Sequence, residues 1–122
     1  MKTKLLFCAL FSLLALSACN NKQPYEVVFD YTISCNEVFT IELQSSPSTG
    51  MNWEWTNKNK VSCIDTIGLD IVPIENKKGA PAIEKWTFKG LKEGDCTLIF
   101  EYIDNTDNKS VVDNKKFMIL VK

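Results

Sequence analysis

The stretch "LQSSPSTGMNWEW", residues 43–55, joins two runs of alternating apolar residues through a polar turn. The apolar members of the two runs are Phe39, Ile41, Leu43, Met51, Trp53 and Trp55. A period of two is that of a half-buried strand, because successive side chains of a strand point to opposite faces. The stretch therefore predicts two strands with a connection between them.

The connection, Ser46–Gly50, has the composition of a shaped loop. A chain reversal alone needs only two residues, whereas this turn is longer and contains both Pro47 and Gly50. Proline presets its φ angle for a turn, and glycine adopts positive φ without steric cost. We predict an ordered binding loop, supported from beneath by a core residue, Trp53; a plain hairpin connection is the alternative.

The alternation continues along the rest of the chain. Further strands are expected around Val27–Ile33, Val61–Ile67, Leu69–Ile74, Trp86–Phe88, Cys96–Tyr102 and Phe117–Val121. Pro73 marks its strand as an edge or an end, since proline has no N–H for a central ladder. Seven or eight short strands without an amphipathic helix predict an all-β, antiparallel two-sheet β-sandwich over residues 25–122.

Residues 1–18 have the features of an export signal. Lys2 and Lys4 precede an apolar run over residues 5–16, which is too short for a transmembrane helix. The run ends in "LSAC", residues 16–19, which resembles the lipobox of bacterial lipoproteins. An ordinary signal peptide with an incidental cysteine is the alternative.

A lipobox implies that Cys19 becomes the acylated first residue of the mature chain. Several acyl chains on one cysteine anchor a protein stably, since each buried methylene contributes about 0.8 kcal/mol. Residues 19–24 are then a lipidated cysteine and a short tether. We expect a cell-envelope protein, and Asn20 after the cysteine favours the outer membrane.

Charge and the lack of histidine exclude several function classes. Removing residues 1–18 leaves a net charge of −3, and the chain contains no arginine and no histidine. A mildly acidic chain lacks the basic surface that nucleic acid requires. Histidine is the commonest general base and the commonest metal ligand. We therefore predict no catalytic residue, no metal and no cofactor, and membrane contact through the lipid alone.

Three cysteines remain beyond the predicted lipidation site. Cys35, Cys63 and Cys96 contain no C-x-x-C spacing, which argues against zinc. An exported protein permits disulfides. One disulfide and one free thiol are possible, and spacing does not choose among the three pairings.

Three segments together carry a resemblance to a known family. They are "SPSTGMNW", residues 46–53, "KGAPAIEKWTF", residues 78–88, and "LKEGDCTLIFEY", residues 91–102. The first resembles the motif N-P-T-T-G-[YF]-x-W of the chagasin-like inhibitors of papain-type cysteine proteases. The second resembles the glycine-rich loop and following aromatic-x-Phe strand of that family, and the third resembles the segment before its third loop. The similarity covers about residues 36–121.

The resemblance implies an immunoglobulin-like sandwich whose three loops, at one end, wedge into the active-site cleft of the protease. In the first loop Pro47, Thr49 and Gly50 match the family, and Ser46 and Ser48 replace its Asn and Thr. The second loop corresponds to Gly79, Ala80, Pro81 and Ala82, of which Gly79 matches the family glycine.

The third loop departs from the family. Its Arg-Pro-Trp aligns with Asp104, Asn105 and Thr106, and none of the three matches. In the family these residues contact the protease beside its catalytic histidine. Losing an aromatic and a cation removes two residue types that dominate interface hot spots.

The resemblance implies a monomeric, reversible inhibitor of papain-like cysteine proteases that occludes the cleft. The alternative is a non-inhibitory surface module for adhesion or carbohydrate binding on the same scaffold. Exposed rings at Trp55 or Trp86 would favour sugar binding, whereas clustered loops over buried tryptophans would favour inhibition.

Overall fold

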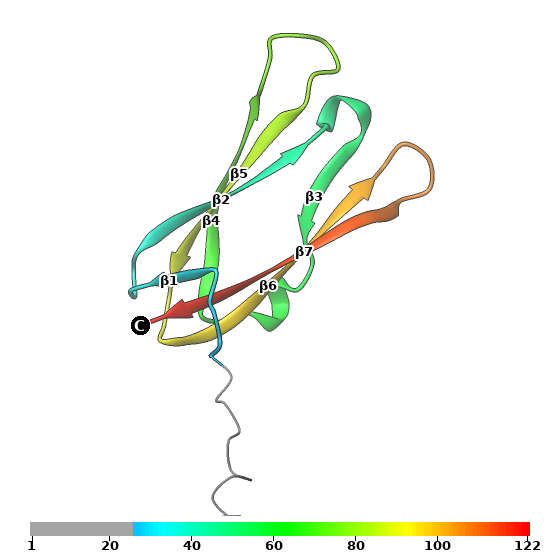
Figure 1. Cartoon of the computed structure of the whole chain (residues 1–122). Coiled ribbons are helices and arrows are strands. Elements are labelled where there is room, and N and C mark those ends of the chain that lie inside the picture. Colours follow the sequence, from blue (N-terminus) through cyan, green and yellow to red (C-terminus); the bar gives the residue numbers. More distant parts are fainter. Residues whose placement is uncertain (1–25) are drawn as a thin grey trace, which may run out of the picture.

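The computed structural model describes residues 26–122 (Figure 1). The predicted signal peptide (residues 1–18) and the whole of the predicted lipidated cysteine and tether (residues 19–24) lie outside the described residues. The elements are β1 (Tyr31–Ile33), β2 (Val38–Ser45), η3 (Pro47–Thr49), β3 (Met51–Trp55), η4 (Lys58–Lys60), β4 (Ile64–Pro73), β5 (Ala82–Gly90), β6 (Gly94–Asp104) and β7 (Ser110–Val121). Within the described part of the chain, no helix has the length and apolar character needed to cross a membrane.

Seven strands form two sheets, which confirms the predicted all-β sandwich. One sheet has the order β1-β7-β6-β3 and the other β2-β5-β4. One pair departs from the antiparallel expectation, because β1 runs parallel to β7. Alternation predicts that a segment is a strand, but it does not say which strand lies beside it. The short turn after β1 crosses to the other sheet, so β1 pairs with the distant β7 instead of with β2.

The inward-facing residues form one core between the sheets. Its buried members are Ile33, Ile41, Leu43, Trp53, Cys63, Ile64, Phe88, Leu98, Phe100, Ile119 and Val121. The rings of Phe88 and Phe100, both completely buried, meet edge to face with their centroids 6.2 Å apart. Burying one large apolar side chain contributes about 1.5–3 kcal/mol. Because every member lies between residues 33 and 121, a fragment of residues 20–122 retains the whole core.

The first predicted strand is shorter than expected. Only Tyr31–Ile33 pairs with β7, and Val27 is 60% exposed instead of facing the core. The reason lies at Asp30, whose carboxylate accepts the backbone N–H of Met118 at 2.7 Å. That side chain takes the donor that a continuing strand would use, so the ladder ends there.

The segment predicted as two strands, residues 61–67 and 69–74, contains a single strand, β4, over Ile64–Pro73. A bulge between Thr66 and Gly68 leaves Ile67 unpaired and exposed. A bulge adds one residue to a strand without ending its pairing, so the interruption in the pattern did not mark a turn. Pro73 is the last residue of β4, and β4 is an edge strand, as proline indicated.

A disulfide between Cys63 and Cys96 links the two sheets. Cys63 immediately precedes β4 and Cys96 lies near the start of β6, with their Cα atoms 6.4 Å apart. Cys35 is free and partly buried. The structure thus selects one of the three pairings that spacing left open.

Candidate functional site

Three connections meet at one end of the sandwich (Figure 1). We call residues 46–50, between β2 and β3, the first loop; residues 74–81, between β4 and β5, the second loop; and residues 105–109, between β6 and β7, the third loop. The two sheets turn their β2, β4 and β6 ends the same way, which brings these distant segments together. The described chain starts and ends at the opposite end.

The first loop is closed by its own hydrogen bonds. The carbonyl of Ser46 accepts the backbone N–H groups of Thr49 (3.1 Å) and Met51 (3.0 Å) and the hydroxyl of Thr49 (2.9 Å). Pro47 opens the single 3-10 turn η3. Ser48 and Thr49 are exposed at its tip. The loop therefore presents two small polar side chains on an ordered backbone.

Gly50 closes this turn in a conformation that favours glycine. Its φ is +86°, and its N–H donates to the carbonyl of Pro47 at 3.0 Å. A Cβ at this position would lie 2.8 Å from the methyl carbon of Thr106. Positive φ is costly for residues with a Cβ, so backbone strain and the third loop both select glycine here.

Trp53 supports the first loop from beneath, as predicted. It is 5% exposed, and its indole N–H donates to the carbonyl of Gln44 at 2.9 Å. Its ring packs against Tyr102 with a centroid distance of 4.8 Å. Because Gln44 and Trp53 flank the loop on both sides, this hydrogen bond ties the two loop stems together.

Glu84 is a buried residue of this end that sequence analysis missed. It is 1% exposed, and its carboxyl group bridges the sheets by accepting the backbone N–H of Trp53 at 3.0 Å and the indole N–H of Trp86 at 3.1 Å. The alternation of apolar residues along β5 could have revealed it, because Glu84 lies two residues from both Ala82 and Trp86 and therefore on the same inward face.

Replacing Glu84 with alanine should destabilise the domain by about 2–4 kcal/mol, because the buried backbone N–H of Trp53 and the partly buried indole N–H of Trp86 lose their acceptor. Urea unfolding of residues 20–122 would measure the change. Glu42→Ala is the matched control, since Glu42 is exposed and forms only a surface ion pair with Lys85 at 3.6 Å, worth at most about 1 kcal/mol. Equal unfolding midpoints for the two variants would contradict the bridging role.

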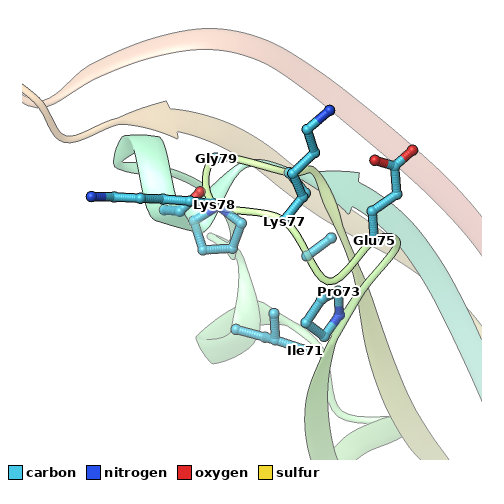
Figure 2. A pocket seen from close by; sticks show the side chains of 10 residues that line it. Ile71, Pro73, Glu75, Lys77, Lys78 and Gly79 are labelled. Atoms are coloured by element: carbon cyan, nitrogen blue, oxygen red, sulfur yellow. The ribbon is translucent and has the colours of Figure 1, made fainter.

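A pocket of about 280 Å³ lies between the first and second loops. Pro47 and Ser48 line it from the first loop, and Ile71 and Pro73 line it from β4; Figure 2 shows Lys77 and the other polar side chains at its rim. The lining is mainly apolar. Ile71 is 50% exposed although it pairs with the buried Glu84, and it lies on β4, the edge strand of its sheet.

The second loop starts earlier than predicted. Gly79, Ala80 and Pro81 lie in it, and Gly79 has a φ of +80° with open space around it. Ala82 is instead the first residue of β5, 4% exposed and paired with both Ser45 and Pro73. Its small side chain fits the strand period, which alone could not mark where the loop ends.

The third loop contacts the first. Asn105 donates its backbone N–H to the carbonyl of Gly50 at 2.8 Å. Asp104 is the last residue of β6, and one of its carboxylate oxygens accepts the N–H and the hydroxyl of Thr106. These hydrogen bonds lower the pKa of Asp104 from its ordinary value of 3.8. Asn105 and Thr106 are exposed beside the first loop.

Trp55 and Trp86 both pack against the core, and neither is an exposed side chain. Each ring meets a core ring in a T-shaped arrangement, Trp55 with Phe88 and Trp86 with Phe100. The indole N–H of Trp55 donates to Asn57, and that of Trp86 donates to Glu84. Their roles are structural.

Comparison with known proteins agrees with the family resemblance of the sequence and with the sandwich fold. The family model described as chagasin family peptidase inhibitor I42 matches residues 32–121. Among solved structures, the cysteine protease inhibitor EhICP2 from Entamoeba histolytica is similar, with a TM-score of 0.61, 21% identity, and coverage of 77% of this chain and 88% of that one. Amebosin is also similar, with a TM-score of 0.53, 17% identity, and coverage of 75% and 84%.

A search of curated proteins found no match. The family match covers β1 except its first residue, the strands β2 to β7 and all three loops. This chain therefore belongs to the chagasin family of peptidase inhibitors.

Proposed function

We propose that this chain inhibits papain-like cysteine proteases reversibly, by placing its first loop in the active-site cleft with the second and third loops on either side. Membership of the chagasin family makes it a protease inhibitor and not an enzyme. The observation that carries the proposed mode is the first loop, whose tip is exposed while its backbone is held by internal hydrogen bonds.

The geometry of the first loop suits inhibition without cleavage. Ser48 and Thr49 are small, so the backbone can approach the base of a narrow cleft. The carbonyl of Pro47 accepts the N–H of Gly50, so the backbone of the first loop is held in the 3-10 turn η3 and is not extended. The loop therefore does not offer the protease an extended segment to cut. Because the loop is ordered before association, little conformational entropy is lost on binding.

Apolar surface beside the first loop supports a protein partner. Ile71, near the end of β4, is 50% exposed and lines the pocket between the first two loops together with Pro47 and Pro73. Exposed apolar surface of this kind can mark an interaction site. This pocket would contact one wall of the protease cleft.

A lipid anchor at Cys19 would leave the three loops free to meet a protease. The "LSAC" sequence supports acylation there, and the described chain begins at the end of the sandwich opposite the three loops (Figure 1). An anchored molecule would thus direct its loops away from the membrane. We propose attachment to a bacterial cell envelope, where the inhibitor would meet secreted or host proteases.

A non-inhibitory binding module remains the second candidate, favoured by one observation. The third loop carries Asp104, Asn105 and Thr106 where the family motif has Arg-Pro-Trp. The structural roles of Trp55 and Trp86 remove the support for a carbohydrate-binding version of this candidate.

Titration of papain and of a cathepsin L-type protease with residues 20–122 tests the proposed function. We expect reversible inhibition in the nanomolar to micromolar range, with the inhibitor recovered uncut after prolonged incubation. Trypsin, whose nucleophile is a serine, is the control and should keep its activity. A folded domain that inhibits no papain-like protease at high micromolar concentration would leave the non-inhibitory module as the function to pursue.

A further inference from the structure

We propose that Asn105 is a positioning residue, which holds the first loop in its binding conformation from the third loop. In this chain the third loop would then act on the protease through the first loop. The inference rests on the proposed function and adds to it the way in which the inhibitory loop is kept in place.

Asn105 makes two hydrogen bonds to the first loop and one to β3. Its backbone N–H and its side-chain Nδ2 both donate to the carbonyl of Gly50, at 2.8 and 3.1 Å. The same Nδ2 donates to Oδ1 of Asn52 at 2.6 Å. One side chain thus contacts both the last residue of the first loop and the strand that follows it.

The shape of the first loop depends on Gly50, the residue that Asn105 contacts. Gly50 closes the turn η3 through its left-handed conformation. Glycine has the widest conformational freedom of any residue, so this position loses the most entropy when it is ordered. Fixing the orientation of the Gly50 carbonyl removes a rotation that would otherwise open the loop.

The third loop is itself shaped to deliver Asn105. The carboxylate of Asp104 accepts the N–H of Thr106 at 2.9 Å and its hydroxyl at 2.6 Å, which forms a tight turn around Asn105. The methyl group of Thr106 then lies over Gly50, where an added Cβ would be only 2.8 Å from it. All three residues that replace the Arg-Pro-Trp motif therefore contribute to contact with the first loop.

The proposed role of Asn105 is in the free inhibitor, and kinetics can distinguish it from a direct contact between Asn105 and the protease. If Asn105 only orders the first loop, its loss lowers the population of binding-competent loop, and the apparent affinity falls by that fraction. Association then slows, whereas dissociation changes little because the cleft itself holds the bound loop. Losing a direct interface contact acts mainly on dissociation.

The test compares Asn105→Ala with Asn108→Ala in residues 20–122. Asn108 is exposed in the same third loop and makes no side-chain hydrogen bond to the described residues. Amide hydrogen exchange of the free proteins should be faster at Thr49, Gly50 and Met51 in Asn105→Ala alone. Association with papain should slow by roughly three- to tenfold, the weight of one or two exposed hydrogen bonds.

Each possible result supports or contradicts the positioning role of Asn105. Unchanged exchange in the first loop, or a change confined to the dissociation rate, overturns the positioning role. If the unaltered domain does not inhibit papain, the proposed function fails, and the exchange comparison still shows whether Asn105 holds the first loop. A general loss of structure would appear as faster exchange at core amides such as Phe88 and Phe100, and would count against a local role.

Discussion

We expect inhibition of papain to be lost when Gly50 is replaced by tryptophan or Thr49 by arginine, while the sandwich stays folded. Gly50 has a φ of +86°, and its Cβ would meet Thr106 at 2.8 Å. The left-handed conformation alone costs a residue with a Cβ about 1–2 kcal/mol. In Gly50→Trp a bulky ring is also added where the first loop closes. We therefore expect its affinity for papain to fall at least about a hundredfold, which corresponds to about 2.8 kcal/mol.

Matched variants separate this effect from general damage. Gly68 lies in the bulge of β4 with nothing within 4 Å of an added Cβ, so Gly68→Ala should inhibit normally. Thr97→Arg places the same large cation on an exposed position of β6, near the end opposite the three loops. Inhibition constants from titration of active-site-titrated papain would measure all four variants. Undiminished inhibition by both first-loop variants would show that the first loop is not the wedge.

Removing the disulfide has the largest expected effect on stability. Cys63 and Cys96 are separated by 33 residues, and closing a loop of that size restricts the unfolded chain by about 4 kcal/mol in the chain-entropy model. A domain of this size has only about 5–15 kcal/mol of total stability. The double variant Cys63→Ala with Cys96→Ala should therefore unfold at a much lower urea concentration.

The same variant tests whether stability and inhibition are separate. The disulfide lies at the starts of β4 and β6, whereas the loops follow the ends of these strands. Below its unfolding transition the variant should inhibit papain as the unaltered domain does. Cys35→Ala is the control, because Cys35 is not part of the disulfide. A double variant as stable as Cys35→Ala would contradict the estimate.

Much of the candidate site follows from local chemistry. Pro47 and Gly50 shape the first loop through their own backbone preferences, and the structure shows the turn with Gly50 at positive φ. Trp53 follows the alternation of its strand into the core. These predictions succeed because each depends on a residue and its immediate neighbours.

Other features of the site depend on segments far apart in the chain. Asn105 contacts Gly50 across 55 positions, and Glu84 contacts Trp53 across 31. No local preference of asparagine or glutamate indicates such a partner. The third loop could be seen to differ from the family motif, but its contacts with the first loop became visible only in three dimensions.

The amino-acid sequence by itself determined most of the strand pattern, most of the core and the turn chemistry of the first loop. Backbone preferences and the period of a strand act over a few residues, and so they can be read along the chain. Only the tertiary structure decided the parallel pairing of β1 with β7, the choice of Cys63 and Cys96, and the contact of Asn105 with Gly50. These are choices of partner, and they depend on how two sheets pack around a shared core.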